Sequence, residues 1–138
     1  MERILAVIEP ELDAPWVVEA AAELARETGG EVTLLAVDDV ESQRFSPLPR
    51  SEIVEKVRLS AERAADRLRE MGLPASTEVR TGRAPDAVLE AADALDAALI
   101  VVSGSPRTPV VERLLGSLAL ELVRRAGRQV LVVTPPNR

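Results

Sequence analysis

Short apolar runs alternate with segments of helical periodicity along the whole chain, and this alternation constrains the fold more than any other feature. Four runs read RILAVIE, EVTLLAVD, ALIVVS and QVLVVT, and a fifth, more polar run reads STEVRT. Their β-branched residues and the Gly and Pro residues that bound them are typical of strands. The sequence therefore predicts strands over residues 3–9, 31–38, 76–81, 98–103 and 129–134.

Helices are predicted between these strands. Asp13 offers an N-cap for the first helix, and Ser51 offers one for the second. Pro85 suits the first turn of the third helix, because proline is tolerated where its missing N–H has no partner. The last helix is indicated by apolar residues that share one side of it, namely Val111, Leu114, Leu115, Leu118 and Leu122.

This order of elements predicts an α/β protein with a three-layer, doubly wound parallel sheet. Strands that are apolar along their whole length are buried on both faces, so helices must cover both sides of the sheet. With 138 residues, 46% of them hydrophobic, the chain has the length and apolar content of one domain over residues 1–138. Such sheets bind ligands at the carboxyl ends of their strands, which here indicates the region of Glu9, Val37 and Gly104.

The composition argues against catalysis. The chain contains no histidine and no cysteine, and Lys56 is its only lysine. Histidine is the commonest general base, and a serine such as Ser117 needs an activating base to act as a nucleophile. Glu9, Glu11 and Asp13 carry oxygen ligands at alternate positions, but Asp13 is better explained as a helix cap. We therefore expect a protein that is not an enzyme and has no metal site of its own.

The charge of the chain excludes further classes of partner. A net charge of −6 argues against a nucleic-acid surface, which needs a basic patch, and against attraction to anionic lipid. The chain has no apolar run of about eighteen residues, and its first segment, MERILAVIEPE, carries charges on both sides of a short apolar stretch. We expect a cytoplasmic protein with no nucleic-acid or membrane partner.

The segment SGSPRTPVVERLLGS, residues 103–117, has two interpretations. A glycine after a strand most often serves a tight turn, and Gly104 can be explained in that way. Gly116 is followed by Ser117 at the expected start of a helix. Because glycine inside a helix lowers the stability of the helix by about 1 kcal/mol, a role at the helix start or in the close approach of a ligand explains Gly116 better. The segment is either a strand-to-helix turn or a loop that holds phosphate.

The chain resembles the universal stress proteins over its whole length. RILAVIEP and ELARETGGEVTLLAVDD carry part of the resemblance, and GRAPDAVLEAADALDAALIVVSGS and LLGSLALELVRRAGRQVLVVTP carry its most specific part. The resemblance implies a five-stranded sheet of order 3-2-1-4-5 with two helices on each face, the adenine-nucleotide α-hydrolase-like fold. It also implies a small stress-response regulatory module with a site for an adenine nucleotide.

The same resemblance assigns residues to this site. In ATP-binding members the loop after the fourth strand follows Gly-x2-Gly-x9-Gly-Ser/Thr, and its amides and final hydroxyl hold the phosphates. The first glycine here is Gly104, and the final pair is Gly116 and Ser117. Val37 takes the position that meets the adenine, and Glu9 takes the position of an Asp at the end of the first strand. The implied ligand is ATP or AMP, accompanied by Mg²⁺.

Departures from the family pattern leave a second hypothesis open. The loop is one residue shorter than the pattern, and Pro106 and Arg107 stand where the second glycine is expected. Pro106 removes an amide donor, whereas Arg107 offers a guanidinium fork for a phosphate. Acidic residues that would repel a triphosphate without a divalent ion are expected at the same rim: Glu9, Glu11, Asp13, Asp38 and Asp39. The alternative is an interaction module that keeps the fold without the pocket.

The last strand is expected to join two copies of the chain. In the order 3-2-1-4-5, residues 129–134 lie at a sheet edge, yet this strand is apolar on both faces, unlike the polar strand 76–81 at the other edge. An unprotected apolar edge invites pairing with another strand, and antiparallel pairing about a twofold axis would cover it. Many universal stress proteins associate in this way, so the resemblance implies the same homodimer here.

Overall fold

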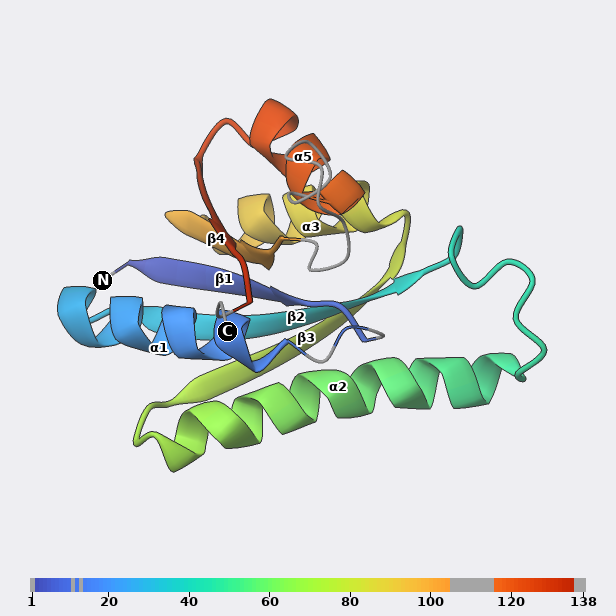
Figure 1. The fold of residues 1–138 in the computed structure, drawn as a ribbon, viewed down its shortest axis with the longest axis horizontal. Coiled ribbons are helices and arrows are strands. Elements are labelled where there is room, and N and C mark those ends of the chain that lie inside the picture. The colour runs from blue at the N-terminus through green and yellow to red at the C-terminus, as the bar shows by residue number, and fades with distance from the viewer. Residues whose placement is uncertain (1, 11, 13, 105–115, 136–138) are drawn as a thin grey trace.

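A parallel sheet forms the centre of the protein. The computed structural model describes residues 2–10, 12, 14–104 and 116–135. The sheet has the order β3-β2-β1-β4-β5, and every neighbouring pair is parallel, which confirms the predicted 3-2-1-4-5 order (Figure 1). Its strands are β1 (Arg3–Ile8), β2 (Glu31–Asp39), β3 (Ala75–Gly82), β4 (Leu99–Ser103) and β5 (Gln129–Val133).

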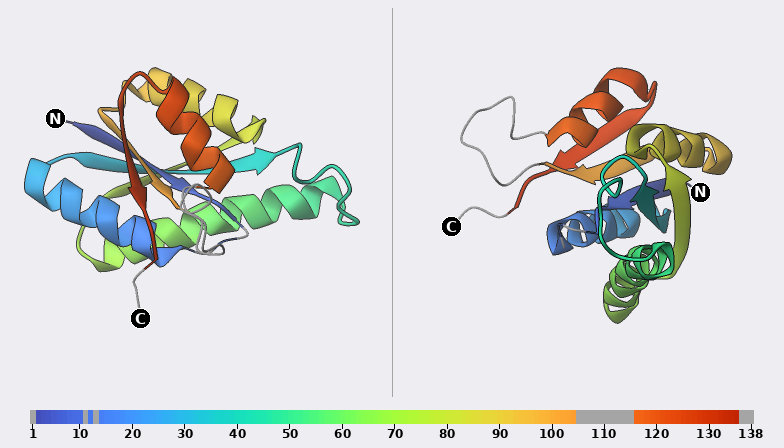
Figure 2. Two further views of the ribbon diagram at one scale, coloured as in Figure 1. Left: turned by 45° about the horizontal axis from the view of Figure 1, so that its top comes forward. Right: turned by 90° about the vertical axis from the view of Figure 1, so that its right-hand side faces the viewer.

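Helices cover both faces of the sheet. One face carries α1 (Pro15–Thr28) and α2 (Arg50–Glu70), and the other carries α3 (Ala84–Leu95) and α5 (Gly116–Arg125), as Figures 1 and 2 show. The protein therefore has the doubly wound, three-layer α/β fold that the alternation of apolar runs and helical segments predicts.

Side chains alternate between two cores on the two faces of β1. Ile4 and Ile8 pack with α1 and α2, whereas Leu5 and Val7 pack with α3 and α5. The same alternation continues in β2, where neighbouring leucines belong to opposite cores and both are fully buried. Because each central strand is buried on both faces, its sequence is continuously apolar and not alternating.

The helix caps differ from the prediction. The N-cap residue of α1 is Ala14, which makes no side-chain cap, and the expected cap Asp13 lies outside the described residues. The second helix begins at Arg50 with Pro49 as its N-cap, so Ser51 lies inside the first turn and the prediction of Ser51 as cap is wrong. Pro49 has φ −60° and ψ 151°, and with this extended residue as N-cap the helix starts two residues earlier than expected.

The last helix keeps part of its predicted stripe. Leu122 is fully buried, and Leu118 packs against the core shared with α3. Gly116 is the first described residue of α5. The other members of the stripe, Val111, Leu114 and Leu115, lie outside the described residues.

Candidate functional site

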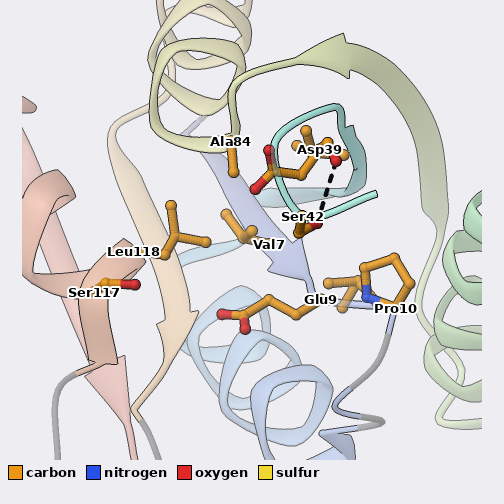
Figure 3. A pocket seen from close by; sticks show the side chains of 10 residues that line it. Val7, Glu9, Pro10, Asp39, Ser42, Ala84, Ser117 and Leu118 are labelled. Atoms are coloured by element: carbon orange, nitrogen blue, oxygen red, sulfur yellow. Dashed lines mark hydrogen bonds between the residues drawn. The ribbon is translucent and has the colours of Figure 1, made fainter. Parts of the chain in front are cut away.

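A cavity of about 160 Å³ lies at the carboxyl ends of β1 and β2, next to the first turns of α3 and α5 (Figure 3). The chain order reverses at this place, because β1 has β2 on one side and β4 on the other. Open parallel sheets bind their ligands at such a switch point. The cavity is lined by Val7, Ile8, Glu9, Pro10, Val37, Asp39, Ser42, Ala84, Ser117 and Leu118.

The fold brings three of the site residues expected from the sequence to this cavity. Glu9 follows β1, Val37 lies near the end of β2, and Ser117 lies in the first turn of α5. Figure 3 shows the Glu9 carboxylate extending toward the side on which Ser117 lies. The first turn of α5 contains no acidic residue, and N–H groups at a helix start have no partner within the helix. Gly116 and Ser117 therefore stand where an anionic group is favoured.

Gly104 has a different role from the one expected. It is buried, and its N–H donates to the carbonyl of Val133 at 2.8 Å, which extends the β4–β5 ladder. Its carbonyl accepts a hydrogen bond from the Ser103 hydroxyl at 2.8 Å, and that hydroxyl accepts one from the indole of Trp16 at 3.0 Å. The Gly104 amide is thus used by the sheet and cannot also donate to a phosphate. Arg107 lies outside the described residues.

Asp38 does not belong to the acidic rim at which the sequence places it. Its side chain is 0% exposed and pairs with the guanidinium of Arg50 at the start of α2. Thr81 donates a further hydrogen bond to the same carboxylate at 3.2 Å. The hydrogen bond and charge of Asp38 raise the pKa of Arg50. Successive side chains of a strand point to opposite faces, so Asp38 faces α2 while its neighbour Val37 faces the cavity.

The turn after β2 brings Asp39, which the sequence places at the acidic rim, to the cavity together with Ser42, which the sequence did not indicate. The side chain of Asp39 accepts a hydrogen bond from the Glu41 amide at 3.1 Å, and the Ser42 hydroxyl donates to the Asp39 carbonyl at 3.1 Å. This turn places Asp39 and Ser42 in the cavity wall, and Ala84 at the start of α3 joins them. One sequence signal could have indicated these residues, because the ends of all parallel strands meet at one edge of the sheet.

The cavity combines groups for three kinds of contact. Val7, Val37 and Leu118 offer an apolar wall, Glu9 and Asp39 offer carboxylates, and Ser117 offers a hydroxyl at a helix start. An apolar wall with a few convergent polar groups is typical of small-molecule sites. In the part of the chain that the structure describes, no group of three or more acidic residues could hold a metal ion by itself. No helix there is long and apolar enough to cross a membrane.

A family model described as the universal stress protein family matches residues 1–134 of this chain. A search of curated protein sequences finds no match.

Solved structures of this family share the fold. A universal stress protein from Archaeoglobus fulgidus is 23% identical with a TM-score of 0.78, over 96% of this chain and 97% of that one. The structure of the universal stress protein from Archaeoglobus fulgidus in complex with dAMP is 21% identical with a TM-score of 0.73, over 96% of each chain. A universal stress protein in complex with cAMP is 20% identical with a TM-score of 0.68, over 98% of each chain. The fold is therefore the adenine-nucleotide α-hydrolase-like fold that the sequence resemblance implies.

Proposed function

Because the chain belongs to the universal stress protein family, we propose that it is a regulatory module that binds an adenine nucleotide, ATP or AMP, in the cavity between β1, β2, α3 and α5. One observation carries this proposal: Glu9, Val37 and Ser117, which come from three separate segments, line one cavity at the switch point of the sheet. The dAMP and cAMP that similar proteins bind support the class of ligand.

Each part of a nucleotide has a matching group in the cavity wall. We expect the adenine to lie against Val7 and Val37, which are almost completely buried in the apolar wall. The ribose hydroxyls are within the reach of carboxylate acceptors such as Glu9. The phosphates are expected at the first turn of α5, where Ser117 offers a hydroxyl. Glu9 and Asp39 add negative charge, so a triphosphate would need Mg²⁺ to reduce the repulsion.

The proposed role is binding and not catalysis. A chain without histidine or cysteine and with a single lysine lacks the side chains that most often activate water or a nucleophile. We place this role in the cytoplasm, as the sequence leads us to expect.

A second candidate function is that of a homodimeric interaction module, and the edge strand β5 favours it. β5 pairs only with β4 in the described sheet, and Leu131 is 37% exposed although it is apolar. The Val133 carbonyl accepts a hydrogen bond from the N–H of Gly104, which directly follows β4, so by alternation the backbone groups of Val130 and Val132 point to the free edge. These free groups could pair with the same strand of a second copy.

A titration with nucleotides tests the proposed binding. Trp16 is the only tryptophan of the chain, and its hydrogen bond to Ser103 places it beside the end of β4. We expect ATP with Mg²⁺ to change the fluorescence of Trp16 and to give a binding signal in calorimetry. The dissociation constant should be micromolar or weaker, which corresponds to a binding free energy no more favourable than about −8 kcal/mol. Adenosine, which has no phosphate, is the matched control and should bind more weakly. Absence of binding by ATP and AMP at millimolar concentration would leave the dimeric interaction module as the function.

A further inference from the structure

A second hollow, of about 270 Å³, lies on the opposite face of the sheet from the proposed nucleotide cavity. It is bounded by the end of β1, the start of α1 and the middle of α2, and these two helices lie side by side on that face (Figure 1). Ile8, Val18 and Ala64 supply the apolar part of its lining. Because Val7 faces the nucleotide cavity and Ile8 packs toward α1 and α2, the end of β1 separates the two spaces.

Two arginines of α2, Arg63 and Arg67, line this hollow. Among the residues that the structure describes, neither guanidinium has a hydrogen bond or an ion pair. Other arginines on the same helix are paired, since Arg58 binds Glu55 at 2.6 Å and Arg69 binds Asp66 at 3.2 Å. Residues four apart share one face of a helix, where like charges repel each other. An anion between Arg63 and Arg67 would remove this repulsion.

The start of α1 adds positive potential to the same hollow. Ala14 and Pro15, which begin this helix, belong to the lining. The N-cap residue Ala14 makes no side-chain hydrogen bond, and the first turn of α1 contains no acidic residue. The partial positive charge of the helix end is therefore not neutralised within the first turn.

Glu9 is the acidic residue in the described lining of the hollow. In Figure 3 its carboxylate is directed toward the side of Ser117, while Pro10 lies on the other side. The carboxylate thus extends into the nucleotide cavity. Among the described residues of the lining, two guanidinium groups and a helix start remain at the hollow.

We propose that this hollow binds a phosphate group through Arg63 and Arg67. A guanidinium presents two parallel N–H donors that match the oxygens of a phosphate, and two guanidiniums balance the charge of a phosphate dianion. The proposal goes beyond the nucleotide site, because it does not need the cavity on the other face. The phosphate has two sources, a free inorganic or oligomeric phosphate, or the phosphate chain of a nucleotide, since both spaces touch Ile8, Glu9 and Pro10.

Titration with inorganic pyrophosphate tests this site. The test variant is Arg63→Gln with Arg67→Gln, and the matched control is Arg58→Gln with Arg69→Gln, which changes the net charge equally on the same helix but outside the hollow. We expect the wild type and the control to bind pyrophosphate within about twofold of each other, and the test variant to bind at least tenfold more weakly. Thermal unfolding checks that both variants are folded.

The proposal is overturned if the wild type does not bind pyrophosphate at millimolar concentration, or if both double variants lose affinity equally, because binding would then follow overall charge. A second variant, Arg63→Lys with Arg67→Lys, keeps the charge without the fork, and we expect its affinity to fall between those of the wild type and the glutamine variant. Equal pyrophosphate affinities of the lysine and glutamine variants would contradict a contribution of the positive charge at these two positions to binding.

Titration with ATP separates the two sources of phosphate. If the nucleotide supplies it, the glutamine variant also loses at least tenfold in ATP affinity, and pyrophosphate competes with ATP. If a free phosphate supplies it, ATP affinity is unchanged and pyrophosphate binds to ATP-saturated protein. A wild type that binds pyrophosphate but not ATP would contradict the proposed nucleotide function and support the phosphate hollow alone.

Discussion

Ser117 joins a hydroxyl to the start of a helix at the edge of the proposed nucleotide cavity. If this hydroxyl donates to a phosphate, Ser117→Ala removes one hydrogen bond, and we expect a loss of about 1 kcal/mol of ATP affinity, roughly fivefold. Unfolding stability should change little, because Ser117 is exposed. Calorimetry measures the ATP affinity of Ser117→Ala. The control is Ser51→Ala, because Ser51 is an exposed serine of α2 that lies outside the cavity. An unchanged ATP affinity in Ser117→Ala would assign Gly116 and Ser117 to helix initiation only.

Asp38 connects the end of β2 with α2 and β3 through Arg50 and Thr81. Replacing this buried carboxylate by alanine removes hydrogen bonds to a charged group, so we expect Asp38→Ala to lower the free energy of unfolding by roughly 1.5–3 kcal/mol. The neighbouring Asp39→Ala should change it by less than about 0.5 kcal/mol, because Asp39 is not fully buried. Urea unfolding measures the free energy of unfolding of both variants. Equal values would mean that the contacts of Asp38 make no net contribution to stability.

The two edge strands of the sheet differ in their protection against pairing. β3 carries charged and hydroxyl side chains, including the pair Arg80 and Glu78 with a separation of 2.5 Å. β5 has no charged side chain, and it also exposes part of Leu131. Charged side chains protect an edge from pairing, and an apolar edge without them tends to pair. The asymmetry favours association through β5 and not through β3.

The backbone alternation of β5 gives a test of this association. Val132→Pro removes an N–H that points to the free edge and leaves the hydrogen bond between Gly104 and Val133 in place. We expect the wild type to sediment as a dimer at micromolar concentration and the folded variant as a monomer. Arg80→Gln at the opposite edge is the control and should remain dimeric. A monomeric wild type, or a folded variant that stays dimeric, would exclude β5 as the interface.

At the scale of the whole molecule, the sequence predicts the fold well, because the apolar runs report burial on both faces and the helices between them fix parallel strands. Predicted strand bounds agree with the structure to within one residue at each end. Caps were harder to predict, since Pro49 takes the N-cap position of α2 with an extended ψ of 151° and without a side-chain hydrogen bond, so no capping side chain marks the start of this helix.

The candidate site was predicted in part, and the reason is geometric. Glu9 and Val37 could be placed because strand ends meet at the switch point, whereas Ser117 was assigned through the resemblance to the universal stress proteins. The burial of Asp38 could not be predicted, because its partner Arg50 lies on another element and only the three-dimensional fold brings the two together. The sheet contact of Gly104 depends in the same way on the position of β5 beside β4.

The most direct test of a nucleotide site at the switch point is an NMR titration of the isotope-labelled protein with ATP and Mg²⁺. We expect the backbone amide signals of Val7, Val37, Ala84 and Ser117 to shift together and to saturate at one stoichiometric equivalent, because these residues line one cavity from four different elements. Amides of the same strands at the opposite end of the sheet, such as those of Ile4 and Val32, should stay in place. Absence of shifts at millimolar ATP, or shifts that leave Val37 and Ser117 unchanged, would contradict a nucleotide site at the switch point.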